Sequence, residues 1–280
     1  MSINDTKQFE DKLKRKENNI SFSFGKNWQN YLKTLTKEKI LIAKKSLKEF
    51  WGNIENRTVI DIGCGSGLFS LSMYLLGAKQ ISSFDVDPFS VQCTEFLRSK
   101  VNNPEKWDIK YGSILDKNFI SKFEKYDIVY SWGVLHHTGK MWEAIKNASS
   151  FVKKDGLFYI AIYNKTNTSK AWLNIKKLYN RLPKIGKILM NFLIFSLSYF
   201  IKPLLSLKNP INKINNYKKT RGMNPMIDVK DWLGGYPYEY ATFKEIKEYV
   251  EDLNQSFKLI KYKKIHPNST GNNYFLFKKT

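Results

Sequence analysis

The chain has 280 residues, of which 42% are hydrophobic and 15% aromatic, so it can bury a sizeable core in one large domain or two small ones. Lys and Arg total 47 against 25 Asp and Glu, and the formal charge of +22 would suit nucleic acid, an anionic membrane surface or a phosphorylated substrate. The lysines are scattered along the chain, which equally fits a solvated surface, and two cysteines exclude a disulfide framework and a Cys-rich zinc site.

The first part of the chain, residues 1–54, is predicted to form a helical cap. Its polar start has no apolar run of the kind found in secretory signals, so we expect a cytoplasmic protein. Residues 27–51 carry apolar side chains, among them Trp28 and Trp51, at helical spacing.

Short apolar runs then alternate with helical patterns, which indicates βαβ units and an α/β fold. We expect a doubly wound, mostly parallel sheet of seven strands. Its first five strands lie in a cofactor-binding half, residues 55–163, and an antiparallel pair follows one more helix in residues 242–280. The strands are predicted at residues 58–62, 80–86, 107–112, 125–132, 156–163, 257–265 and 273–279. Two helix starts are also predicted, an N-cap at Asp87 before Pro88 and a capping box between Thr242 and Glu245.

A helical insertion, residues 164–241, separates the two halves and is the predicted substrate cap. Its most apolar segment, Ile188–Ile201, is shorter than the roughly 20 residues that a spanning helix needs. Lys184, Lys187 and Lys202 flank it, which favours contact with a membrane surface. A lid over an apolar ligand and a buried helix are the alternatives.

A glycine loop follows the first predicted strand in the stretch VIDIGCGSG, with Gly63, Gly65 and Gly67 between strand and helix. Such glycines let a ligand approach the backbone, and the helix N-terminus offers it free N–H groups. Asp85 ends the next strand about 20 residues later, where an acid can hold ribose hydroxyls. Asp61 would repel a pyrophosphate but suits the ammonium of an amino-acid-bearing cofactor.

Several motifs together resemble the class I S-adenosylmethionine-dependent methyltransferase superfamily, including relatives such as the quinone O-methyltransferases. They are DIGCGSG, SFDVDP, KYGSILD, YDIVYSWGVLHHTG and KDGLFYIAIYN. The resemblance covers residues 55–164 and resumes at 242–280, and it implies S-adenosyl-L-methionine as the cofactor. Many relatives carry an acid where Ser113 stands, so weaker but retained binding is expected. The cofactor contacts implied by the resemblance are Asp61, Gly63, Gly65, Asp85, Val86, Ser113, Ile114 and Trp132, with Trp28 from a segment that folds over the cofactor.

Two adjacent histidines, His136 and His137, leave the fourth strand in SWGVLHHTG, at the sheet edge where ligands bind. If the acceptor is a hydroxyl, one of them can be the base that takes its proton. Neighbouring side chains in an extended segment point opposite ways, so we expect only one to face substrate, with His137 favoured. A structural role for either histidine remains an alternative.

The stretch RGMNPMIDVKDWLGGYPYEY in the insertion is predicted to be an irregular loop. Its density of charged and aromatic groups indicates a substrate wall, and a loop that only docks on the core is the alternative. The candidate substrate residues are Arg221, Asp231, Trp232, Tyr236 and Tyr238.

The resulting hypothesis is a cytoplasmic methyltransferase that acts on a small-molecule acceptor, most simply a hydroxyl. The acceptor is either lipophilic and quinone-like or a sugar or nucleotide-linked glycan precursor, and contact with the inner face of a membrane would fit the first. An RNA methyltransferase and a non-catalytic protein that binds S-adenosylmethionine are the alternatives. Nucleic acid is the less favoured partner because no separate RNA-binding module is evident, and no metal site is predicted.

Overall fold

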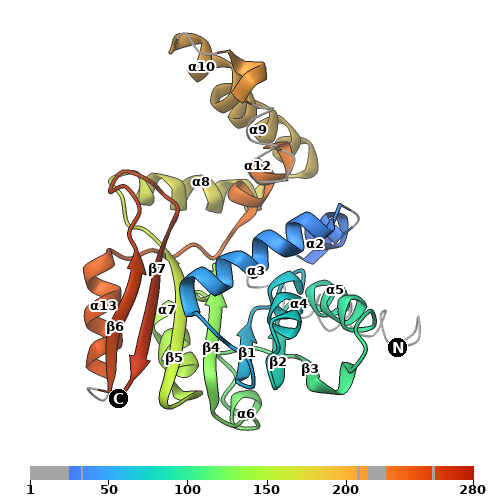
Figure 1. Cartoon of the computed structure of the whole chain (residues 1–280). Coiled ribbons are helices and arrows are strands. Elements are labelled where there is room, and N and C mark those ends of the chain that lie inside the picture. The colour runs from blue at the N-terminus through green and yellow to red at the C-terminus, as the bar shows by residue number, and fades with distance from the viewer. Residues whose placement is uncertain (1–24, 33, 207–208, 214–224, 254–255) are drawn as a thin grey trace.

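A computed structural model of the chain describes residues 25–32, 34–206, 209–213, 225–253 and 256–280, arranged around one central sheet (Figure 1). The strand order is β3-β2-β1-β4-β5-β7-β6, with β1 to β5 parallel and β7 antiparallel to both of its neighbours. This confirms the predicted doubly wound, mostly parallel sheet. The strands are β1 (Thr58–Ile62), β2 (Gln80–Asp85), β3 (Trp107–Tyr111), β4 (Tyr126–Trp132), β5 (Val152–Tyr163), β6 (Phe257–Lys263) and β7 (Asn272–Lys279).

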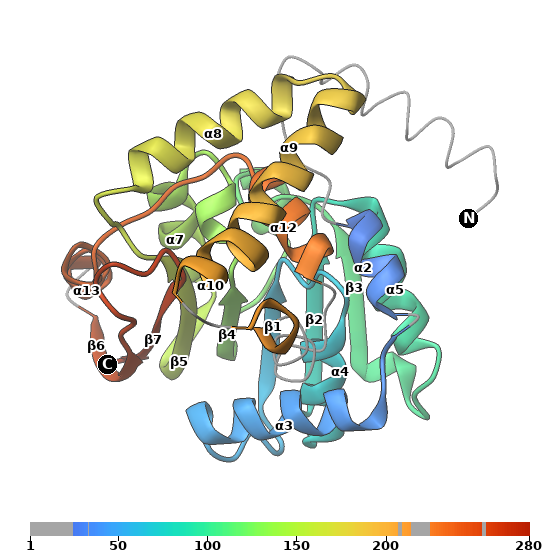
Figure 2. The same ribbon diagram turned by 90° about the horizontal axis from the view of Figure 1, so that it is seen from above.

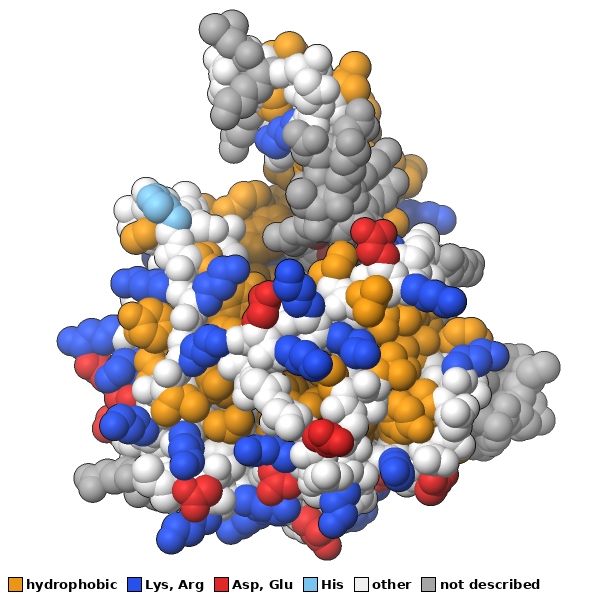
Figure 3. Space-filling view, in the orientation of Figure 1, with side chains coloured by type: hydrophobic (Ala, Val, Ile, Leu, Met, Phe, Trp, Pro, Cys, Tyr) orange, Lys and Arg blue, Asp and Glu red, His pale blue; other side chains and the backbone are white. Residues whose placement is uncertain are grey.

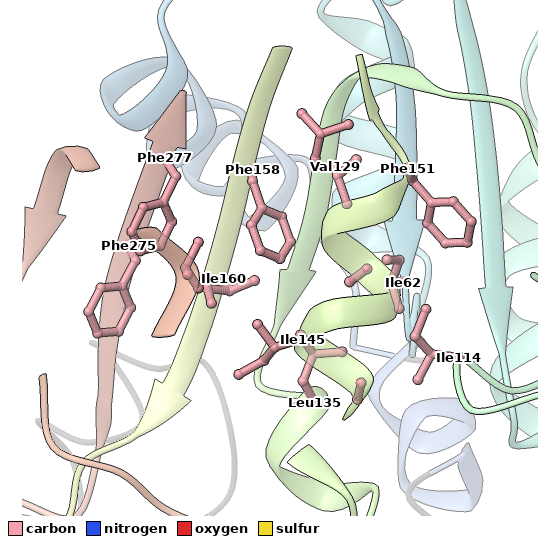
Figure 4. Close-up of a cluster of buried hydrophobic side chains, with 14 of the residues drawn as sticks. Ile62, Ile114, Val129, Leu135, Ile145, Phe151, Phe158, Ile160, Phe275 and Phe277 are labelled. Carbon is pink, nitrogen blue, oxygen red and sulfur yellow. The ribbon is translucent and has the colours of Figure 1, made fainter. Parts of the chain in front are cut away.

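Helices cover both faces of the sheet, because strands buried on both faces send apolar side chains alternately to either side. One core lies between the sheet and α6, α7 and α13, and aromatic and branched side chains fill it (Figure 4). The second lies between the sheet and α3, α4 and α5, around Trp51 and Trp107. The bounds are α3 (Lys37–Trp51), α4 (Leu68–Leu75), α5 (Pro88–Arg98), α6 (Lys117–Ile120), α7 (Met141–Ser150) and α13 (Phe243–Asp252), with short 3₁₀ turns η1 (Pro104–Lys106) and η2 (Leu135–His137).

The described part of the N-terminal cap is helical, and the pattern over residues 27–51 is divided into α2 (Gly25–Leu32) and α3; residues 1–24 of the predicted cap lie outside the described residues. Thr36 begins α3 as its N-cap, since its hydroxyl accepts a hydrogen bond from the amide of Lys39. The division lets α2 leave the sheet and pack against α5 (Figure 1).

The predicted starts of α5 and α13 are confirmed. The Asp87 carboxylate accepts from the amide of Phe89, with Pro88 at the first helical position. Thr242 and Glu245 form both hydrogen bonds of the capping box.

The insertion forms a small helical layer over the carboxyl edge of the parallel strands (Figure 2). Its own core joins α8, α9 and α12 around Tyr179, Tyr199, Val229 and Leu233. The prediction of an irregular loop over RGMNPMIDVKDWLGGYPYEY is wrong for its middle part, because Pro225 begins a helix whose buried Val229 and Leu233 are four residues apart. The elements are α8 (Ser169–Arg181), α9 (Lys184–Ser196), a π-helical turn η3 (Leu197–Ile201), α10 (Lys202–Leu205) and α12 (Pro225–Gly234).

The apolar segment of the insertion is longer than the sequence pattern predicted. Among the described residues, Lys184–Leu205 is one helix of 22 residues that is, by length and composition, long and apolar enough to cross a membrane. An 18-residue window of it has a mean hydropathy of 1.7, and 12% of that window is buried. The expectation of a run too short to span is therefore corrected. Pro203 has no N–H for the carbonyl of Tyr199, which accounts for the π-helical turn. We call Lys184–Leu205 the apolar arm, and it rises away from the sheet (Figure 1).

Candidate active site

The glycine loop lies where β1 ends and α4 begins. Gly63, Gly65 and Gly67 all have positive φ angles, of 75°, 56° and 77°, a conformation that favours glycine. A side chain at Gly63 would collide with Val134, and one at Gly65 would lie 3.1 Å from the indole nitrogen of Trp28. The loop is therefore shaped for close approach to its backbone, with the first turn of α4 behind it.

Asp85 ends β2 beside this loop. Its carboxylate accepts hydrogen bonds from the amide of Gly65 at 3.0 Å and the amide of Asp87 at 2.9 Å. Burial raises the pKa of Asp85 to about 6, and the backbone hydrogen bonds oppose that rise. A ligand hydroxyl that donated to this carboxylate would favour its charged form, as the ribose of an adenosyl group can.

Asp61 lies in β1 behind the glycine loop and is buried. The Ser70 hydroxyl donates to its carboxylate at 2.5 Å, and Ser70 in turn meets the hydroxyl of Ser83 at 2.9 Å. Burial raises the pKa of Asp61 to about 7; the bond from Ser70 lowers it, and the charge of Asp85 raises it further. A ligand ammonium would restore the charged carboxylate, so Asp61 fits the role that the sequence predicted for it.

The N-terminal cap closes over the same loop. The amide of Gly25 donates to the Asp87 carboxylate at 3.0 Å, and a side chain at Gly25 would collide with that carboxylate. This contact brings Trp28 against Gly65, far along the chain. Trp28 is thus placed where the sequence expected a residue that folds over the cofactor.

Three further predicted cofactor residues follow the ends of β2 and β3. Val86 follows Asp85 and is exposed. Ser113 is half-buried, and its hydroxyl accepts from the amide of Leu115 at 3.2 Å. The side chain of Ile114 is buried in the core (Figure 4) and its carbonyl accepts from the side-chain amide of Asn147 at 2.8 Å, so its role as a cofactor contact stays a prediction.

Trp132 ends β4 and lies on the side of the sheet covered by α3 and α4. Its ring is 40% exposed and stacks between Phe69 at 6.4 Å and Tyr274 at 6.2 Å, measured between ring centroids. Its exposed edge is therefore at the carboxyl end of the sheet, and its role as a cofactor contact stays a prediction.

His136 is fully buried in η2 and packs on Tyr163, with 3.9 Å between the ring centroids. Its Nδ1 accepts from the amide of Tyr163 at 3.3 Å, and its Nε2 has no hydrogen-bond partner among the described residues. Burial first, and then the charge of His137, lowers the pKa of His136 well below its usual value. His136 is therefore a neutral ring that packs the end of β5.

His137 is half-buried and turns toward the insertion. Its Nδ1–H donates to the carbonyl of Pro237 at 2.5 Å, which makes Nε2 the basic nitrogen of the ring. Burial lowers the pKa of His137 to about 3, although the bond to Pro237 raises it. The ring is thus neutral near pH 7, the state that a base needs.

The segment after α12 is tied to the histidine loop. The amide of Glu239 donates to the carbonyl of His136 at 2.9 Å, and the Glu239 carboxylate accepts from the amide of Met141 at 3.1 and 3.0 Å. Tyr236 and Tyr238 flank Pro237, whose carbonyl accepts from His137. The C-terminal end of the insertion and the loop after β4 therefore form one wall.

The structure brings only some of the predicted substrate residues together at the histidine loop. Trp232 and Tyr238 contact Tyr163, with ring centroids 5.6 and 5.3 Å apart, and through it they reach the histidines. Asp231 lies near Tyr179, where its charge raises the pKa of that phenol after burial. Arg221 lies outside the described residues.

Two residues of this wall, Tyr163 and Lys176, were not singled out from the sequence. Lys176 lies on α8 and is 0% exposed. The helical spacing from Trp172 through Lys176 to Tyr179 places it on the apolar face of α8, and that signal could have found it. Among the described residues, no group of three or more His, Cys, Asp or Glu side chains is placed to hold a metal ion.

Comparison with known proteins identifies the family of the chain. Residues 35–187, more than half of the chain, match a family described as a methyltransferase domain. The chain belongs to this methyltransferase family. It is 31% identical over 183 residues to a ubiquinone biosynthesis O-methyltransferase of Pelagibacter ubique, which covers 64% of this chain and 70% of that protein.

Other relatives of this methyltransferase act on other substrates by name. A tRNA U34 carboxymethyltransferase of Campylobacter jejuni subsp. doylei is 23% identical over 182 residues, 65% of this chain and 53% of that protein. The structure of magnesium protoporphyrin IX methyltransferase from Synechocystis PCC 6803 with bound SAH superposes with a TM-score of 0.51 at 14% identity, over 87% of this chain and 83% of that one. That likeness shows the fold.

The methyltransferase is an enzyme that uses S-adenosylmethionine, and the glycine loop, Asp61 and Asp85 fit this cofactor. The two carboxylates have pKa values near neutrality and no salt bridge to a lysine or arginine among the described residues. Ribose hydroxyls would therefore stabilise the charged form of Asp85, and a ligand ammonium would stabilise that of Asp61. The cofactor supplies an electrophilic methyl group. The residues of the chain hold it and place an acceptor beside it.

Proposed function

We propose that this methyltransferase transfers the methyl group to a hydroxyl of a small, lipophilic acceptor with a planar, quinone-like ring. The likeness to a ubiquinone biosynthesis O-methyltransferase supports a hydroxyl acceptor. The wall formed by Tyr163, Trp232 and Tyr238 supports a flat ring, because aromatic faces stack on flat ligands.

The observation that carries a lipophilic acceptor is the apolar arm. Phe192 and Leu193 on it are 66% and 57% exposed, and proteins that stay in water rarely expose a patch of this kind. The exposed Lys184 at its start would attract anionic headgroups. The exposed apolar side chains of the arm are Ile185, Ile188, Leu189, Phe192, Leu193, Phe200, Ile201, Leu204 and Leu205.

The arm is continuous with the acceptor wall. Its helix α9 packs on α8 and α12, and α12 carries Trp232. An acceptor held in the bilayer surface would thus meet the site without crossing water. We infer a cytoplasmic enzyme that lies peripherally on the inner face of the membrane.

His137 supports the hydroxyl acceptor as the base. It is neutral near pH 7, its Nε2 is the basic nitrogen, and it borders the acceptor wall through Tyr163 at 5.4 Å between ring centroids. Removal of the hydroxyl proton is the only proton transfer that such a reaction needs.

The distribution of charge on the surface favours an RNA acceptor less than a small-molecule acceptor. On the face seen in Figure 3, Lys and Arg side chains are dispersed among acidic and apolar groups rather than gathered in a stripe. A nucleic-acid groove needs clustered cations along one path.

The test uses S-adenosylmethionine with a labelled methyl group and three acceptors: a short-chain quinol with a free hydroxyl, a nucleotide-linked sugar and unmodified tRNA. The Asp85→Ala variant is the control for cofactor-dependent transfer. We expect label in the quinol, released as a methyl ether. Label that enters only the sugar or only the tRNA would replace this proposal, and label in none of the three would count against it.

A further inference from the structure

A buried amine without an acidic partner lies beside the acceptor wall. Lys176 is fully buried on α8, which is rare for lysine unless a carboxylate pairs with it. Among the described residues no carboxylate forms a salt bridge with Lys176, and burial alone lowers its pKa, to about 7. A positive charge on the amine at this position therefore lowers the stability of the folded protein.

Aromatic faces surround this amine. Its Nζ lies 3.9 Å from the centroid of the Trp232 ring and 4.8 Å from that of Tyr238. Such faces attract a cation but do not neutralise it. The cage thus holds the amine in a place that water does not reach, where an anion bound beside it would be attracted strongly and would favour the charged form of the amine.

The cage borders the histidine loop. Tyr163 contacts both cage rings and both histidines. After burial, the positive charge of Lys176 also lowers the pKa of His136 and of His137. The titratable groups that these contacts bring to this side are His136, His137, Tyr163 and Tyr238, and none of them is a carboxylate.

We propose that Lys176 is the anion-binding residue of the acceptor site, and that the acceptor presents an ionised oxygen to it, as an acidic phenol or a ring carboxylate does. The rings of Trp232, Tyr238 and Tyr163 would hold the planar part of that acceptor. This inference rests on the proposed function and narrows its substrate class. Where this ionised oxygen is the one that takes the methyl group, as in a phenolate, it has already lost its proton and does not need His137 as a base.

A purely structural role makes a different prediction. Lys176 donates to the carbonyl of Trp232, and Asn180 donates to the carbonyl of Gly234 at 3.0 Å, so both side chains satisfy the C-terminal end of α12. If that were the whole role, Lys176→Met and Asn180→Ala would both lower stability, and neither would change which ligand binds.

The experiment compares two probes with the same ring, 4-nitrophenol and its uncharged methyl ether 4-nitroanisole, on enzyme saturated with S-adenosylhomocysteine. We expect the wild type to bind the phenol at least about tenfold more tightly than the ether. The bound phenol should also turn yellow at a pH where it is colourless in water. Lys176→Met should abolish both effects, while Asn180→Ala and the exposed control Lys177→Met should keep them.

Two results would overturn the inference: a wild type that shows no preference for the phenol, including one that binds neither probe, or a Lys176→Met variant that keeps the preference. Binding of S-adenosylhomocysteine is measured first on every variant. A wild type that does not bind S-adenosylhomocysteine would count against the proposed function itself. Normal binding without a phenol preference would count against Lys176 alone.

Discussion

The burial of Lys176 allows a sharp prediction about stability. Replacement with Met keeps the length and apolar stem of the side chain and removes the amine. Each tenfold change in proton affinity is worth about 1.4 kcal/mol, so a pKa that falls from 10.5 to about 7 costs the folded state about 5 kcal/mol when the amine is protonated. The lost hydrogen bond to the Trp232 carbonyl offsets about 1 kcal/mol of the gain, or somewhat more because that carbonyl is left unpaired.

The pH dependence gives the sign of this effect. Between about pH 7 and pH 10.5 the unfolded chain holds the Lys176 proton and the folded protein has released it, so the stability of the wild type rises with pH across this window. We therefore expect Lys176→Met to raise the free energy of unfolding by about 2–4 kcal/mol near pH 6. That gain should fall to about zero near pH 10.

The assay is urea unfolding followed by tryptophan fluorescence at about pH 6, 8 and 10, with Lys177→Met as the matched control on the exposed face of α8. A variant that is less stable than the wild type near pH 6 would refute the reasoning. So would a gain that does not change with pH, because the cost would then not come from burial of a charge. If Lys176→Met is more stable than the wild type and loses the preference for the phenol, Lys176 serves function at the expense of stability.

The remaining predictions concern the cofactor, the histidines and the arm. Asp85→Ala should weaken S-adenosylmethionine binding by about 1–3 kcal/mol in titration calorimetry, because ribose hydroxyls lose their acceptor; an unchanged affinity would remove Asp85 from the site. If the acceptor arrives with its proton, His137→Ala should lower turnover by roughly 10²–10⁴-fold at unchanged cofactor affinity, and His136→Ala should lower the melting temperature. The reverse pattern would exchange their roles. Because the pKa of His137 is about 3, this residue should cause no loss of rate between about pH 8 and pH 5. Phe192→Ser with Leu193→Ser should release the protein from anionic vesicles at unchanged melting temperature; persistent co-sedimentation would refute membrane contact by the arm.

The positions of the strands, the glycine loop and Asp85 could be predicted from the sequence, because local rules set them. Alternating apolar runs mark strands, a positive φ calls for glycine at Gly63 and Gly65, and the Thr242 capping box involves residues only three apart. The division of residues 27–51 into two helices and the helix at Pro225 were missed. Both depend on short polar or proline-containing stretches whose helical pattern is weak.

The sequence determined the fold and the sheet edge at which the glycine loop and Asp85 lie, since each follows from neighbours along the chain, and the resemblance of its motifs to a family implied the cofactor. Only the tertiary structure decided which histidine is buried, because Tyr163, 27 residues away, packs on His136 and donates to it. It also decided that Lys176 lies in a cage with Trp232, 56 residues away, and that the arm is exposed rather than buried. Burial and charge in a pocket depend on distant segments that meet in space, and no local pattern records which of them will meet.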